Sequence, residues 1–168
     1  QDGSGGILNI NGIPLTCGGA YPCTATFSTN DIIDTSPPTN VNIDVSGQLC
    51  IDTDNDLLAS ARDDSGINYF DFNSDVDNIG TDNAPTCAGA APNVLCNGNI
   101  LWTPTNADGY FAGTAYNLNV TAMDLDANSA TSGNKRVTLR VAHCCNSVQD
   151  MDEEGLDCGG ADCAGSPW

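Results

Sequence analysis

Carboxylates spaced two residues apart are the side chains in this sequence best suited to chemistry. The clearest run is Asp150-x-Asp152-x-Glu154-Gly155, with Asp157 close behind it. Alternating oxygen ligands followed by glycine let a tight turn wrap around one Ca2+ ion. The twelfth residue of the run is Ala161 rather than the bidentate acid of an EF-hand. We therefore expect a calcium loop stapled by Cys158 and no helix-flanked EF-hand.

Two further acidic runs share this alternation. The first is Asp52, Asp54 and Asp56, with Asp63 at the twelfth place, and the second is Asp71, Asn73, Asp75 and Asp77, with Asp82 at the twelfth place. Crowded carboxylates repel one another unless a cation neutralises them. A solvated acidic loop is the alternative for each run taken singly, but three runs in one chain favour ion sites. We predict Ca2+ at all three.

A fourth acidic group, Asp124-Leu-Asp126-x-Asn128, fits a hairpin turn better than an ion site. Asp and Asn side chains accept hydrogen bonds from backbone groups two residues on, which stabilises turns between strands. We expect a turn here first and a cation ligand second.

Nine cysteines in 168 residues indicate an oxidising compartment. Zinc is the competing interpretation, but the sequence has one histidine and no C-x-x-C pair. Short separations favour bridges Cys17–Cys23 and Cys87–Cys96. One of Cys144 and Cys145 is expected to pair with Cys50, and the other with Cys158 or Cys163. The odd total leaves one thiol unpaired or available for an intermolecular bridge.

The charge balance excludes several classes of partner. The chain has 22 acidic residues against four Lys and Arg, a formal charge of -18. Nucleic acid and anionic membrane surfaces repel such a chain, and cations are its natural partners. No apolar run is long enough to span a bilayer, so we expect no membrane insertion.

No residue set in the sequence predicts catalysis. His143 lies beside Cys144 and Cys145, but disulfide-bonded cysteines are not nucleophiles, and strand alternation would point His143 and Cys144 to opposite faces. No pair of acids is singled out for glycoside hydrolysis, and there is no phosphate loop or G-x-S-x-G. We expect a protein that is not an enzyme.

The elements that position these side chains are predicted to be short strands. Apolar and polar residues alternate over 41–45, 116–122 and 137–141. Further candidate strands are 7–10, 25–28, 49–52, 67–72 and 100–103. Turn residues separate them, and no long amphipathic helix is indicated. This pattern predicts an all-β antiparallel sandwich, in which the acidic stretch 52–99 forms strands carrying large, ion-tied loops.

The segment from Ile100-Leu-Trp-Thr-Pro to Tyr110, then Tyr116-Asn-Leu-Asn-Val-Thr-Ala-Met-Asp and Arg136-Val-Thr-Leu-Arg-Val, resembles bacterial Ig-like and cadherin-like surface repeats. The resemblance covers about residues 99–141 and implies a sandwich with Trp102 in its core and Asp124 at a strand end. The tail from Cys145 to Cys163 is similar to acidic, cysteine-rich motifs at the ends of exported bacterial surface proteins. Both resemblances imply a secreted protein, extracellular or on the cell surface.

Three segments follow from these patterns. Residues 1–16 contain a detached apolar β segment, Ile7–Leu15, which either forms an ordinary first strand or adds to a neighbour's sheet edge. Residues 17–143 form the sandwich, with long ion-binding loops, and residues 144–168 form a small disulfide-stapled tail. Asn119-Val-Thr121 is a glycosylation sequon on the polar face of its strand.

We expect an extracellular structural subunit that self-assembles into a surface filament or matrix, through strand donation or loop contacts, stabilised by calcium and disulfides. The alternative is a monomeric calcium-dependent adhesin or carbohydrate-binding module that takes glycans as partners.

Overall fold

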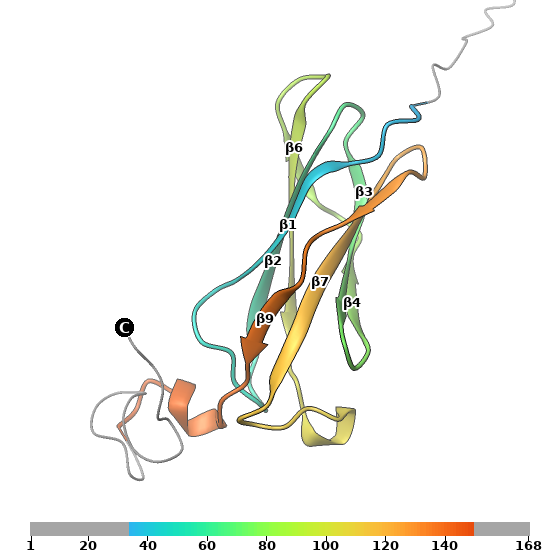
Figure 1. The fold of residues 1–168 in the computed structure, drawn as a ribbon. Helices are drawn as coiled ribbons and strands as arrows, with labels where there is room; N and C mark the ends of the chain where they lie inside the picture. The colour runs from blue at the N-terminus through green and yellow to red at the C-terminus, as the bar shows by residue number, and fades with distance from the viewer. Residues whose placement is uncertain (1–33, 150–168) are drawn as a thin grey trace, which may run out of the picture. The chain divides into compact units, whose positions relative to one another are not determined.

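A computed structural model describes residues 34–149 of the chain, which fold into an all-β antiparallel sandwich of two packed sheets (Figure 1). The predicted fold class is therefore confirmed. Chain contacts divide the sequence into two compact units, Gln1–Ile32 and Ile33–Trp168. The boundary predicted after residue 16, the segment Ile7–Leu15 and the bridge Cys17–Cys23 lie outside the described residues.

The first sheet has the strand order β1-β2-β6-β5. Its strands are β1 (Thr39–Val45), β2 (Asn55–Asp63), β5 (Thr86–Ala88) and β6 (Val94–Trp102). β2 and β6 pair along their full lengths without a register shift, from Asn55 opposite Trp102 to Asp63 opposite Val94. The three-residue β5 covers only residues 95–97 of β6.

The second sheet has the order β4-β3-β7, and both β8 and β9 pair with the other edge of β7. Its strands are β3 (Ile67–Ser74), β4 (Asn78–Asp82), β7 (Ala115–Asp124), β8 (Ser129–Thr131) and β9 (Lys135–Thr138). Two short 3-10 helices complete the described part, Asn106–Asp108 and Ala142–Cys145.

The core lies between the sheets and is built from the inward positions of both. Strand alternation places Leu57 of β2, Phe70 of β3 and Leu118 of β7 inward, and all three are fully buried. Trp102 is 5% exposed and stacks edge-on against Tyr110 with ring centroids 5.0 Å apart. Its burial agrees with the expectation drawn from the resemblance to surface repeats.

Gly98 of β6 lies in close contact with side chains of the opposite sheet. A Cβ atom there would lie 2.5 Å from a ring carbon of Phe70 and 2.7 Å from Asp82 Oδ2. Glycine at this position is what allows the aromatic ring of one sheet to sit against the backbone of the other.

One lateral side of the sandwich is closed by links between the two sheets. Lys135 of β9 donates to Asp44 of β1 at 2.9 Å, and Figure 1 shows these strands, orange and blue, side by side. Further along, Cys50 pairs in parallel with Arg140, through Ile51 N–H to Arg140 O and Arg140 N–H to Leu49 O, both 2.9 Å. These bonds occupy backbone groups that an edge strand would otherwise expose.

The stretch 52–99 differs from its prediction. It is mostly strand, comprising β2, β3, β4, β5 and much of β6, joined by short turns instead of large loops. β2 buries Ala59 and Ala61, whose small side chains mark an apolar face weakly in the sequence. Conversely, residues 49–52 form an isolated bridge and a turn, not a strand.

One disulfide links the neighbouring strands β5 and β6, and another links residues 95 positions apart in the sequence. The predicted bridge Cys87–Cys96 is present, and Cys50 pairs with Cys145, one of its two expected partners. Cys144 is disulfide-bonded as well. Residues 142–145 form a 3-10 helix, so the strand alternation expected to separate His143 and Cys144 does not apply. Among residues 34–149, no helix is long and apolar enough to cross a membrane.

Candidate metal centre

Three carboxylates from distant parts of the chain meet at one end of the sandwich. Asp34 precedes β1, Asp63 ends β2 and Asp124 ends β7. Each offers one oxygen, and the three oxygens lie within 4.8 Å of one another. Asp63 is 5% exposed and Asp124 only 1%, so two of the three sit in the protein interior.

Local turns hold the two buried carboxylates in place. Asp63 Oδ1 accepts bonds from the Ser65 backbone (2.9 Å), the Ser65 hydroxyl (2.8 Å) and the Gly66 backbone (3.1 Å). Asp124 Oδ1 accepts from the backbones of Asp126 (2.9 Å) and Asn128 (2.8 Å). The predicted hairpin turn at 124–128 is therefore present, and it also orients a carboxylate toward the cluster.

The segment before β1 is tied to the same end of the molecule. Asn128 Nδ2 donates both to Asp124 Oδ2 (2.9 Å) and to the backbone carbonyl of Asp34 (2.8 Å). Asp34 Oδ1 in turn accepts from the Ser36 backbone at 2.8 Å. One asparagine thus connects the β7–β8 turn to the point where the chain enters the sandwich.

A fourth carboxyl, Asp64, contacts Asp34. The contact lowers the pKa of Asp34, whereas the same contact, together with burial and the charges of Asp34 and Asp63, raises the pKa of Asp64. Asp34 Oδ2 and Asp64 Oδ1 are both buried with no hydrogen-bond partner in the described part of the chain. Buried acceptors of this kind normally have a donor or a cation opposite them.

These residues fit a hard divalent cation. Calcium takes six to eight oxygens at about 2.3–2.6 Å, so oxygens on opposite sides of one ion lie up to about 5 Å apart. The three carboxylate oxygens are close enough together for one such ion to contact all of them. Within residues 34–149, none of the three clustered carboxylates forms an ion pair with a lysine or arginine, so the repulsion among them has no counter-charge from this part of the chain.

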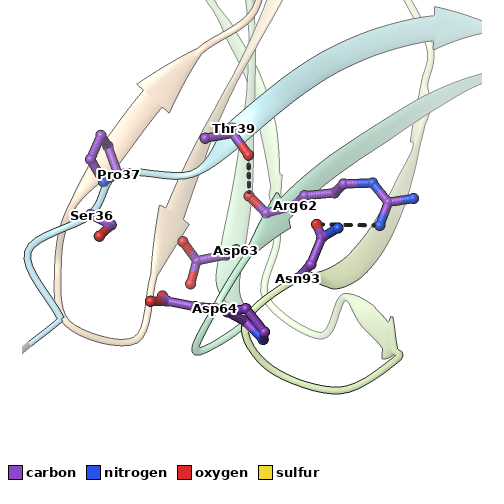
Figure 2. A pocket seen from close by; sticks show the side chains of 8 residues that line it. Ser36, Pro37, Thr39, Arg62, Asp63, Asp64 and Asn93 are labelled. Atoms are coloured by element: carbon purple, nitrogen blue, oxygen red, sulfur yellow. Dashed lines mark hydrogen bonds between the residues drawn. The ribbon is translucent and has the colours of Figure 1, made fainter.

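A pocket of about 180 Å³ opens beside the cluster, lined by residues of the entering segment, the end of β2 and the loop before β6. Figure 2 shows the carboxylates of Asp63 and Asp64 pointing the same way, toward the segment that carries Ser36. On the other side, Arg62 donates to Asn93 Oδ1 at 3.4 Å. The pocket therefore combines acids, a guanidinium and hydroxyl groups.

The first predicted ion run is not brought together. Asp52 and Asp54 lie before β2 and Asp63 ends it, so roughly 30 Å of strand separates Asp54 from Asp63. Asp54 instead accepts a bond from the Thr103 hydroxyl, and Asp56 is exposed on the outer face of β2. Strand β2 forms where the prediction placed a loop, and this spreads the acids along the sheet.

The second predicted run is spread over β3, the β3–β4 turn and β4, and each acid has its own donors. Asp71 Oδ1 accepts from Asn78 and Thr81, Asp75 from Asn117, Asp77 from Ser74 and Tyr110, and Asp82 from the backbones of Ala84 and Asn99. Asn73 lies on the outer face of β3 and donates to the Asp71 carbonyl. Each of these carboxylates therefore accepts hydrogen bonds from neutral donors.

The remaining predicted sites are placed as follows. Asn119 is half-buried on the outward face of β7, opposite Asn73 of β3. The run from Asp150 to Asp157 lies outside the described residues, as do Cys158 and Cys163.

Sequence reasoning did not select Asp34 or Asp64, and it assigned Asp63 to a different site. The sequence feature that could have indicated the site is the position of acids at the ends of alternating runs, at Asp63-Asp64 and at Asp124. Strand ends on the same edge of a sandwich can meet, although residues 34, 63 and 124 are far apart in sequence.

No protein-family model matches this chain, and no curated protein matches it either.

Proposed function

We propose that the chain is an extracellular structural subunit that self-assembles into a filament or matrix, with Ca2+ held by Asp34, Asp63 and Asp124. The observation that carries this proposal is the carboxylate cluster, with the unpartnered buried oxygens of Asp34 and Asp64 beside it. The role is architectural, not catalytic, and the disulfides suit an oxidising extracellular setting.

The position of the cluster links calcium to architecture. Asp34 stands just inside the boundary between the units Gln1–Ile32 and Ile33–Trp168. A cation shared by Asp34, Asp63 and Asp124 would tie the entering chain to β2 and to β7, one strand from each sheet. Calcium would then hold the sheets together.

Negative-stain microscopy of the purified full chain, with calcium and with EDTA, tests the proposal. We expect ordered assemblies in calcium and their loss or disordering in EDTA, with recovery on adding calcium back. Monomers under both conditions would overturn the self-assembly. Assemblies that form equally well in EDTA would remove calcium from the proposal.

A second candidate function is a calcium-dependent carbohydrate-binding module, favoured by the pocket beside the cluster. Its lining of Ser36, Thr39, Arg62 and Asn93 offers the hydroxyl, guanidinium and amide groups that bind sugar hydroxyls. Its volume of about 180 Å³ suits one sugar ring. A glycan array probed in calcium and in EDTA decides between the two, because a monomer with calcium-dependent hits would favour this candidate.

A further inference from the structure

The lateral side of the sandwich opposite the β1–β9 seam is open over part of its length. On that side the first sheet ends at the short strand β5 and the second sheet ends at β4. β5 covers residues 95–97 of β6, and Asn99 N–H donates to the carboxylate of Asp82 at 3.0 Å. Beyond Asn99, no strand among the described residues pairs with the outer edge of β6.

The register shows which backbone groups are left free on this edge. Asp56 O accepts from Ser46 N–H on the β1 side, and Asn99 N–H points to Asp82, away from β2. Asp56 lies opposite Leu101 in a ladder without register shifts. Since hydrogen-bonded and non-hydrogen-bonded pairs alternate, the N–H and C=O of Leu101 also point away from β2, with no partner among residues 34–149.

The apolar side chains at this opening are incompletely covered. Ile79 of β4 and Ile100 of β6 pack against the core but remain partly exposed, whereas core residues such as Phe70 are fully buried. Leu101 is 64% exposed. A strand added beside β6 would cover these side chains and pair the free backbone groups, which is the pattern of β-augmentation.

A pocket of about 250 Å³ lies at the same place. It is lined by residues of β4, by the end of β6 and by the Thr103–Tyr110 connection. Two of its residues, Asp77 and Asp108, are carboxylates. In a chain of net charge -18, an occupant of this opening must be uncharged or cationic to avoid repulsion.

We propose that this opening, the acceptor groove between β4 and residues 99–102 of β6, takes the segment Ile7–Leu15 of a second copy as an added strand. The inference rests on the proposed self-assembly and names its contact. The segment carries no charge, its apolar residues suit Ile79 and Ile100, and its amides Asn9 and Asn11 suit Asp77 and Asp108. It belongs to the first of the two units, Gln1–Ile32.

The alternative is that the groove takes the segment Ile7–Leu15 of the same chain, and the test must distinguish this from a segment of a second copy. Residues 16–33, fully extended, reach about 60 Å, which exceeds the roughly 30 Å length of β6. The length of this linker therefore allows a strand from a neighbour or from the same chain. The test must measure both the assembly state and the protection of the β6 edge at Leu101.

Leu101→Pro is the variant that tests the groove in the full chain. Proline removes the N–H that faces the opening and leaves the ladder with β2 intact. Leu101→Thr is the matched control, because it also removes the apolar side chain but keeps the N–H. In calcium, we expect Leu101→Pro to reduce the mass of assembled protein at least tenfold relative to the wild type. We expect Leu101→Thr to assemble to an extent much closer to that of the wild type.

Hydrogen exchange at the Leu101 amide of the unmodified chain provides a second measurement that does not depend on a variant folding. We expect this amide to exchange at least tenfold more slowly in assemblies than in monomers. Assembly of folded Leu101→Pro at the wild-type level, or an amide that stays unprotected in assemblies, would overturn the groove while leaving self-assembly standing. If the wild type is monomeric and its Leu101 amide is protected, the groove is occupied by the segment Ile7–Leu15 of the same chain. If the wild type is monomeric and this amide is unprotected, both the groove and the self-assembly are overturned.

Discussion

Asp34 and Asp64 bring two carboxyl groups into contact, and each retains a buried oxygen without a hydrogen-bond partner in the described part of the chain. In the absence of a cation such a contact favours protonation of one partner, here Asp64, whose pKa is raised. A divalent cation removes this conflict. The contact therefore links the protonation of Asp64 to the charge of Asp34.

The first prediction concerns Asp64→Asn. The amide removes one negative charge and can donate to Asp34, so the metal-free variant should be more stable than the metal-free wild type. Calcium should stabilise the wild type by about 2.7 kcal/mol at 100 times its Kd, and the variant should bind calcium at least tenfold more weakly. Thermal unfolding in EDTA and isothermal titration with calcium measure the two effects.

Asp56→Asn is the control for this prediction. It changes the charge by the same amount on the outer face of β2, away from the cluster. We expect its calcium affinity to match the wild type. If both variants bound calcium equally weakly, the calcium affinity would depend on the overall charge of the chain and not on this cluster.

The second prediction concerns pH and the ion pair between Lys135 and Asp44. The hydrogen bond from Lys135, then the Val45 backbone N–H and the lysine charge, lower the pKa of Asp44. A lowered folded-state pKa means that the stabilisation is present above the ordinary carboxyl pKa and is lost as pH falls through the folded value. Both side chains are substantially exposed, so the effect on stability is small.

Lys135→Met should therefore move the pKa of Asp44 upward, toward the ordinary range, because only the Val45 contact then remains to lower it. Carboxyl carbon chemical shifts followed through an NMR pH titration measure this directly. Arg136→Met removes the neighbouring positive charge as a control. If both substitutions shifted Asp44 equally, the cause would be general electrostatics and not the ion pair.

The third prediction ranks the two disulfides. Cys50–Cys145 spans 95 residues and Cys87–Cys96 spans nine. Loop-closure entropy in the unfolded chain gives losses of about 4.7 kcal/mol for the first and about 2.6 kcal/mol for the second. Urea unfolding of Cys50→Ala/Cys145→Ala and Cys87→Ala/Cys96→Ala should show this order. The reverse order would mean that contacts in the folded state outweigh the chain entropy.

The fourth prediction concerns Asn55, a buried asparagine at the start of β2. Its Nδ2 donates to the carbonyls of Cys50 (2.8 Å), Thr53 (2.9 Å) and Trp102 (3.0 Å), and its Oδ1 accepts from the Cys50 N–H (2.8 Å). Asn55→Ala leaves buried backbone groups unpaired and should cost at least about 2 kcal/mol. Chemical unfolding checks this. Asn97→Ala, on an exposed position of β6, should change stability far less.

The sandwich was predictable from the sequence where alternation is strong. Residues 41–45 and 116–122 alternate clearly, and they form β1 and the central part of β7. The short separation of Cys87 and Cys96 likewise predicted their bridge. Alternation and short separations are local properties, so they can be identified without knowing which strands become neighbours.

Strand β2 shows where local reasoning failed. Its inward residues include alanines, and its flanking acids suggested a loop, yet it lies between β1 and β6 and is mostly buried on one face. Ala59 and Ala61 are nevertheless buried in the core between the sheets. The free edge at Leu101 could not be predicted either, because it depends on β5 ending after three residues.

By itself, the sequence determined that this protein is a β-rich, acidic chain with many cysteines and closely spaced carboxylates. Only the tertiary structure decided which carboxylates meet. Asp34, Asp63 and Asp124 are distant in sequence and converge because β2 and β7, in opposite sheets, end at the same edge of the sandwich. Spacing along a chain identifies ligands only within one loop, whereas a site built from strand ends depends on strand order and register, which long-range packing selects.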